Sequence, residues 1–159
     1  MTTPPSVTNR VVVGVDGSTP SDAALRWARF LAETIGGTLQ AVTVAPSYAD
    51  WAPAGWAAAG WAGVPADWDP TRDANRLLDQ ALDRVFGDDR PPALQTTAAQ
   101  GNPAKALLEA SEGARMLVVG SRGHGGFTGL LLGSVSAACA EHATCPVLVV
   151  HGLTPPPPR

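Results

Sequence analysis

Short apolar segments alternate with longer amphipathic ones along this chain. Residues 10–16 (RVVVGVD) and 116–119 (MLVV) are continuous apolar runs bounded by turn residues, which is typical of strands buried on both faces of a sheet. Residues 146–150 have the same character, residues 38–44 form a further run that predicts a strand, and residues 94–99 alternate apolar and polar positions as a half-buried edge strand does. The pattern therefore predicts five strands.

Amphipathic segments between these runs predict four helices. In the first, Thr19 is the expected N-cap before Pro20, Gly36 closes the segment, and the inward face is formed by Ala24, Ala28, Leu31 and Ile35. Asp69-Pro70 begins the second helix, Gly87 lies beyond its end, and the expected inward positions are Leu77, Leu78, Ala81, Leu82 and Val85. Asn102-Pro103 caps a third helix that runs to about Gly113, and the fourth begins near Ser134.

Strands that alternate with helices predict an α/β fold, with one doubly wound five-stranded parallel sheet and helices on both of its faces, a Rossmann-like arrangement. We expect a flexible N-terminus at residues 1–9, one domain at residues 10–151, and a Pro-rich disordered tail at residues 152–159. In such sheets a ligand binds beyond the carboxyl ends of the strands, at the point where the strand order reverses.

Composition excludes several classes of protein. Acidic residues outnumber basic ones by 14 to 11, Lys105 is the single lysine, and no basic cluster indicates a nucleic-acid partner. No apolar run approaches the roughly 20 residues that span a bilayer, and the N-terminal residues do not resemble a targeting signal, so we expect a cytoplasmic protein. Cys139 and Cys145 are too few for a disulfide framework and lack the neighbours of a zinc site.

The candidate chemistry lies in the glycine-rich stretch at residues 120–134 (GSRGHGGFTGLLLGS), between a predicted buried strand and a predicted helix. Glycines let main-chain N–H groups approach an anion, and a helix start adds unpaired N–H groups and a partial positive charge. A merely flexible surface loop would not explain so many glycines in this position. We therefore expect a phosphate group to bind here, with the Ser134 hydroxyl beside it.

Two common phosphate-binding patterns do not fit this stretch. The pattern GxxxxGK[ST] requires a lysine, and none lies near these glycines, which excludes a P-loop NTPase. In the dinucleotide pattern GxGxxG, counted from Gly123, the third glycine would be Gly129, one position late, and the connection between strand and helix is too long.

The stretch instead resembles the universal stress protein family, whose pattern G-x2-G-x9-G-[ST] is met by Gly120, Gly123, Gly133 and Ser134. The resemblance extends from about Arg10 to His151. It includes the opening VVVGVDGS, the turn at residues 101–103 and the closing CPVLVV. It implies a fold similar to that of the adenine-nucleotide α-hydrolases.

In the ATP-binding branch of that family, the glycine loop and the following serine hold the ribose and phosphates. The aspartate after strand one and a main-chain position late in strand two hold the adenosine, and Asp16 and Val44 match these positions. Asp16 could instead be a turn carboxylate and Val44 an ordinary core residue. Gly14 stands where some nucleotide binders have proline. The candidate nucleotide-binding residues are Gly14, Asp16, Val44, Gly120, Arg122, Gly123, Gly133, Ser134 and Val135.

Hydrolysis has little support in the sequence. Arg122 could pair with a phosphate or be a solvated loop residue, and His124 has no evident partner to orient it as a base. The leading hypothesis is a stress-response or signalling protein that binds ATP, or ADP or AMP, with or without Mg²⁺, and turns it over slowly or not at all. The alternative is a nucleotide-independent module of the same fold that binds another protein, as yet unknown.

Two further features of the sequence indicate partners or motion. Residues 46–69 hold Trp51, Trp56, Trp61 and Trp68 without helical or strand spacing, which predicts a Trp-rich insertion that acts as a lid, binds a partner or covers the domain itself. Residues 147–150 form an apolar last strand without charge, which predicts an open sheet edge and a homodimer formed through it, unless residues 151–153 fold back over that edge.

Overall fold

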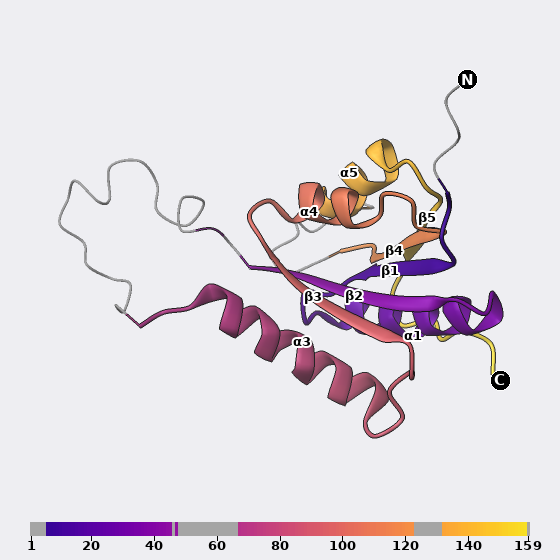
Figure 1. Cartoon of the computed structure of the whole chain (residues 1–159), viewed down its shortest axis with the longest axis horizontal. Helices are drawn as coiled ribbons and strands as arrows, with labels where there is room; N and C mark the ends of the chain where they lie inside the picture. The colour runs from indigo at the N-terminus through magenta and orange to yellow at the C-terminus, as the bar shows by residue number, and fades with distance from the viewer. Residues whose placement is uncertain (1–5, 46, 48–66, 123–131, 159) are drawn as a thin grey trace.

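The computed structural model describes residues 6–45, 47, 67–122 and 132–158. All five predicted strands are present in it: β1 (Arg10–Gly14), β2 (Thr38–Ala45), β3 (Leu94–Gln100), β4 (Met116–Gly120) and β5 (Val147–Val150). They form one parallel sheet in the order β3-β2-β1-β4-β5 (Figure 1). The predicted α/β class is therefore confirmed, and β3 lies at one edge of the sheet as its alternating sequence indicated.

The helices also follow the predicted segments: α1 (Thr19–Thr34), α3 (Pro70–Phe86), α4 (Pro103–Ala110) and α5 (Ser134–His142). Asp69 and Asn102 cap α3 and α4 through side-chain oxygens that accept from first-turn N–H groups. The predicted cap of α1 is wrong by one residue, because the Ser18 side chain accepts from Ser21 N–H while Thr19 is already helical. Ile35 was also predicted wrongly as a core residue, since it ends α1 and is 36% exposed.

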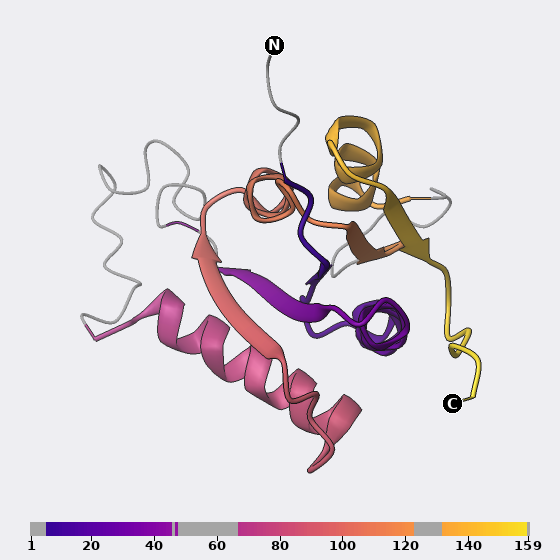
Figure 2. The ribbon, with the colours of Figure 1, turned by 45° about the vertical axis from the view of Figure 1, so that its right-hand side comes forward.

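The sheet is covered on both faces (Figure 2). On one face, α1 and α3 pack against alternate strand residues such as Val11 and Val13. On the other, Leu107 of α4 and Cys139 of α5 pack with Val12 in a second cluster. Burial of successive residues on opposite faces explains why β1 and β4 are apolar without interruption.

Side chains also tie together the two helices on the first face. The Arg84 guanidinium on α3 binds both oxygens of the Asp22 carboxylate on α1, with Nε at 2.6 Å from Oδ2. These hydrogen bonds raise the pKa of Arg84 above its usual value. Among the described residues at the N-terminus, Thr8 donates to Gly113 C=O and Asn9 C=O accepts from Thr38 N–H, which anchors the chain just before β1.

Candidate nucleotide-binding site

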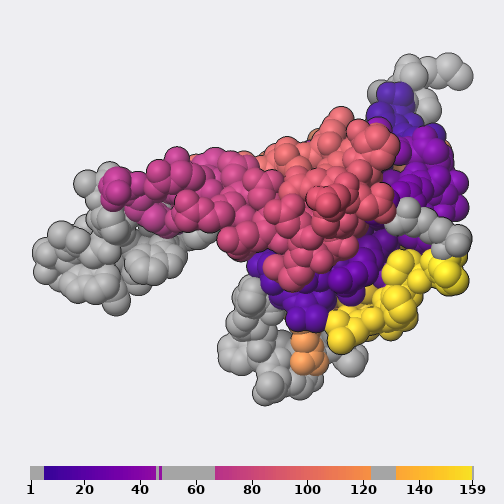
Figure 3. All heavy atoms as spheres, turned by 90° about the horizontal axis from the view of Figure 1, so that it is seen from below, coloured from indigo at the N-terminus to yellow at the C-terminus, as the bar shows by residue number. Residues whose placement is uncertain are grey.

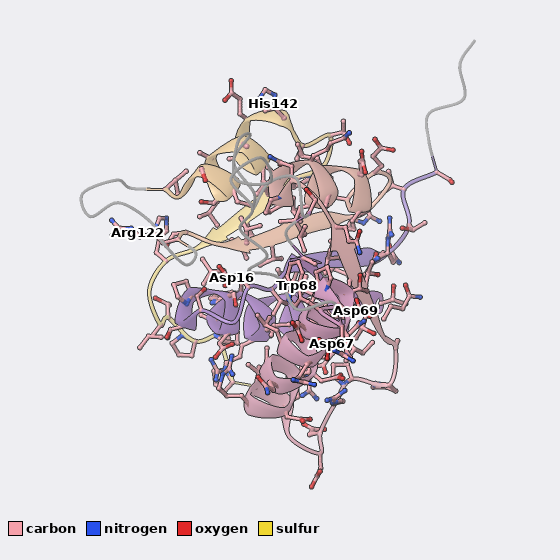
Figure 4. The ribbon with its side chains drawn as sticks, turned by 90° about the vertical axis from the view of Figure 1, so that its left-hand side faces the viewer. Asp16, Asp67, Trp68, Asp69, Arg122 and His142 are labelled. Atoms are coloured by element: carbon pink, nitrogen blue, oxygen red, sulfur yellow. The ribbon has the colours of Figure 1, made fainter. Side chains whose placement is uncertain are left out.

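A cavity of about 730 Å³ opens beyond the carboxyl ends of β1 and β4. The chain leaves β1 toward β2 on one side and returns to β4 on the other, so the strand order reverses between these two neighbours. This is the place where open α/β sheets bind ligands, and the volume lies in the range of about 300–1,000 Å³ typical of ligand pockets. Asp16 and Arg122 both lie at this end of the sheet, whereas His142 lies at the far end of α5 (Figure 4).

The candidate residues chosen from the sequence meet in this cavity. Eight of the nine line it: Gly14, Asp16, Val44, Gly120, Arg122, Gly133, Ser134 and Val135. The ninth, Gly123, lies outside the described residues, as do His124 and most of the Trp-rich segment. The structure therefore brings together segments that are more than 100 positions apart in the sequence.

Asp16 shapes the loop between β1 and α1. Its Oδ1 accepts from Ser18 N–H at 2.9 Å and also from the Ser18 hydroxyl, while Asp16 N–H donates to Ser21 Oγ at 3.4 Å. The turn interpretation raised by the sequence is therefore correct for this oxygen. The carboxylate nevertheless borders the cavity, where it can accept a hydrogen bond from a ligand hydroxyl.

Gly14 and Gly120 lie close to helices beneath the cavity, and Gly120 is required there because its neighbour is main chain. A Cβ on Gly120 would lie 2.9 Å from the main-chain carbon of Pro20 on α1, and one on Gly14 would lie 2.9 Å from a methyl group of Leu107 on α4. Both glycines thus allow helices to approach the ends of the central strands. This structural role was not recognised in the sequence, where Gly120 was interpreted only as part of a phosphate loop.

The start of α5 forms one wall of the cavity. Gly133 is its N-cap, with φ −70° and ψ 166°, and as a glycine it has no side chain with which to cap the first turn. Gly133 N–H donates to Ser121 C=O at 2.7 Å, and the buried Ser136 hydroxyl donates to the same oxygen at 2.9 Å, which fixes the helix start against the end of β4. Helix N-termini of this kind offer N–H groups and a partial positive charge to an anion.

Main-chain groups of β2 form another wall. Val15 N–H donates to Val42 C=O at 2.8 Å, so the polar groups of Val42 point toward β1. Because alternate strand residues direct these groups to the same side, those of Val44 also point toward β1. The paired register of β1 ends at Gly14, opposite Val42. The N–H and C=O of Val44 therefore border the cavity beyond the end of β1.

Several lining residues were not predicted as part of the site. They are Val15, Ser21, Val42, Thr43, Leu77, Pro103, Leu107, Val119, Leu132, Ser136 and Ala137. Most are apolar, and the sequence marked Leu77 only as an inward position of α3. Among the described lining residues Asp16 is the single carboxylate, and the described residues hold no group of three or more His, Cys, Asp or Glu suited to a metal ion.

The two cysteines, Cys139 on α5 and Cys145 between α5 and β5, lie outside this lining. Both are free thiols that pack in the cluster on the α4 and α5 face, and Cys139 is fully buried there. Burial raises the pKa of the Cys139 thiol to about 11, so it is protonated at neutral pH and behaves as a small apolar side chain.

Comparison with known proteins agrees with this geometry. The profile of the universal stress protein family matches residues 8–151. The chain belongs to the universal stress protein family. A universal stress protein of Mycolicibacterium smegmatis is 34% identical over 143 residues, and one of Mycobacterium tuberculosis is 35% identical over 148 residues. The matches cover 89% of this chain but 48% and 47% of those relatives, so the chain spans about half their length.

Solved universal stress protein structures have the same fold. The protein UspA of Lactobacillus plantarum superimposes with a TM-score of 0.67 at 20% identity, covering 91% of this chain and 97% of its own. A universal stress protein in complex with cAMP superimposes with a TM-score of 0.57 at 29% identity, covering 92% and 99%. Within the described residues of this family member, no helix is long and apolar enough to cross a membrane.

Proposed function

We propose that this universal stress protein binds an adenine nucleotide, ATP or its hydrolysis products, and acts in a stress response as a nucleotide-dependent signalling protein. The observation that carries the proposal is the cavity at the strand-order reversal, which collects every described residue of the family's nucleotide pattern. The related structure with bound cAMP supports an adenine nucleotide as the ligand class. The cytoplasmic location expected from the sequence remains a prediction.

Each part of a nucleotide has a matching wall in this cavity. The N–H and C=O of Val44 can pair with the acceptor and donor on the edge of adenine, and the Asp16 carboxylate can accept from a ribose hydroxyl. The first turn of α5 and the Arg122 guanidinium can receive the phosphates. A Mg²⁺ ion would take most of its ligands from phosphate and water, since Asp16 is the single carboxylate in the described lining.

The first prediction is that the purified protein carries an adenine nucleotide. Denaturing it and analysing the released small molecules by mass spectrometry is expected to yield ATP, ADP or AMP at near-stoichiometric amounts. The same analysis identifies the predominant nucleotide. If no nucleotide is released and calorimetry detects no binding of added ATP, the alternative of a nucleotide-independent protein-interaction module is favoured.

The second prediction concerns turnover. Activation of water needs a general base within reach of it, and the described lining holds no His, Lys or Cys and only one carboxylate, Asp16, whose Oδ1 is engaged by Ser18 in the loop after β1. We expect ATP turnover far below the enzyme median of about 10 per second. Steady-state phosphate release measures it, and a rate near that median that Asp16→Asn abolishes would contradict the proposal.

The third prediction is a homodimer formed through β5. Pro146 and Val150 C=O both accept from the β4 side, so the alternating ladder directs the N–H and C=O of Val149 outward at the open edge. An apolar edge strand without charge can pair with the same strand of a second copy, related by two-fold symmetry. Light scattering at micromolar concentration is expected to detect a dimer.

Val149→Pro is expected to give a monomer, because it removes the outward N–H without breaking a bond to β4. Val149→Ala keeps that N–H and serves as the control for lost side-chain packing. A monomeric wild-type protein, or a dimer that persists in Val149→Pro, would refute pairing through this strand.

A further inference from the structure

The C-terminal tail makes a specific contact with α1 that nucleotide binding does not explain. Trp27 Nε1 donates to the main-chain oxygen of Thr154 at 2.8 Å, across 127 positions of sequence. Trp27 also forms an edge-to-face pair with Phe30, with ring centroids 6.0 Å apart and planes at 88°. Trp27, which is partly buried and also packs against the core cluster on the α1 and α3 face, thus receives the chain that follows β5.

A turn after β5 directs the chain into this contact. After β5, Gly152 adopts φ +59°, a conformation that favours glycine, within a turn at residues 152–153. This turn directs Thr154 and the prolines after it onto α1, and Figure 3 shows the yellow tail lying against the indigo and purple residues of the early chain. The turn therefore leads the tail away from the open edge of β5.

The chemistry of the two surfaces is complementary. Pro155–Pro158 lack N–H groups and can only accept hydrogen bonds, whereas an indole N–H can only donate. Consecutive prolines already favour the polyproline II helix, so docking costs them little conformational entropy. That helix has three residues per turn, and Pro156 is partly buried while Pro155, Pro157 and Pro158 are exposed. Pro156 is thus the proline of this segment that faces the protein.

We propose that Trp27 and Phe30 form a polyproline-binding surface whose ligand is the tail of the same chain, residues 154–158. The short tether keeps the tail at an effective concentration of about millimolar or above, so a contact that is weak between separate molecules is occupied within one molecule. The contact that defines the surface is the indole N–H of Trp27, which donates to Thr154 C=O, and Pro156 is the proline of the segment that is partly buried.

The test follows the indole N–H of Trp27 in nitrogen-15 NMR spectra of the full chain, with the resonance assigned by its loss in Trp27→Phe. Pro156→Gly is expected to increase solvent exchange of this N–H by about fivefold, the effect of losing one weak contact. Pro157→Gly is the matched control, since that proline is exposed, and it is expected to change the exchange by less than about twofold. Equal effects of the two variants, or no effect of either, would overturn the proposal.

A second experiment separates binding from local rearrangement. In a full-length variant with all four of Pro155–Pro158 changed to serine, a capped TPPPP peptide is added at millimolar concentration. The Trp27 indole resonance is expected to return toward its wild-type position with saturation, and a capped TSSSS peptide is expected to leave it unmoved. An absence of saturation with TPPPP would show that Trp27 and Phe30 do not bind polyproline. Exchange protection that falls on dilution of the wild-type chain would indicate instead that the tail binds a second copy.

Discussion

Gly133→Asp is expected to abolish nucleotide binding while leaving the protein at least as stable as before. Gly133 has an extended conformation that any residue can adopt, so aspartate introduces no backbone strain. Its carboxylate would cap α5 and occupy the N–H groups assigned to phosphate, and it would repel the phosphate charge. We expect the affinity for ATP to fall by about 100-fold or more, and the free energy of unfolding to rise by about 0.5 kcal/mol.

Gly133→Asn is the matched control for this experiment. Asparagine has nearly the same shape and caps a helix equally well, but it carries no charge. Its loss of affinity measures competition for the N–H groups alone, for which we expect about tenfold. Calorimetric titration and denaturant unfolding give the two quantities for each variant. Wild-type affinity in a folded Gly133→Asp protein would show that the phosphates do not bind at the start of α5.

Gly37→Ala adds only one methyl group, yet it is expected to lower the free energy of unfolding strongly. Its Cβ would overlap the main-chain carbonyl of Asn9, whose carbon would lie 2.9 Å away. Main chain cannot rotate out of the way as a side chain can, and this carbonyl accepts from Thr38 N–H at the start of the pairing between β1 and β2. We expect a loss of about 3 kcal/mol in the free energy of unfolding.

The neighbouring Gly36 gives the comparison. It adopts φ +62° but has open space around its Cβ position, so alanine there brings backbone strain without a clash. We expect Gly36→Ala to cost about 1 kcal/mol. Urea unfolding of both variants compares them directly. If Gly37→Ala were the milder change, the close approach of Asn9 would not be the constraint at this position.

The strands and helices were predictable because their residues obey local rules. Parallel strands covered on both faces are largely apolar, and Asp69 and Asn102 mark helix starts by their capping chemistry. The same reasoning missed Ser18 as the cap of α1, because Thr19 before Pro20 satisfies the same pattern. Only the backbone conformation distinguishes the two, since Ser18 is extended and Thr19 is helical.

The glycines of the cavity could be predicted from the sequence, whereas most of its apolar lining residues could not. The glycine pattern has a fixed spacing, so it can be found in one sequence. Leu77, Pro103 and Leu107 line the cavity only because α3 and α4 pack where they do, and nothing local distinguishes them from core residues. Gly120 shows the opposite error. The sequence assigned it to the phosphate loop alone, although the close approach of Pro20 also requires a glycine there.

The strand order places β3 at the sheet edge opposite to β5, and this second edge matters for assembly. In a dimer joined at β5, one continuous sheet would span both protomers and end in a β3 strand on either side. That strand, LQTTAAQ, carries neither charge nor proline, the two usual deterrents against pairing with other chains. Dimerisation would thus leave two uncapped ends, from which partly unfolded or crowded molecules could extend the sheet into fibrous aggregates.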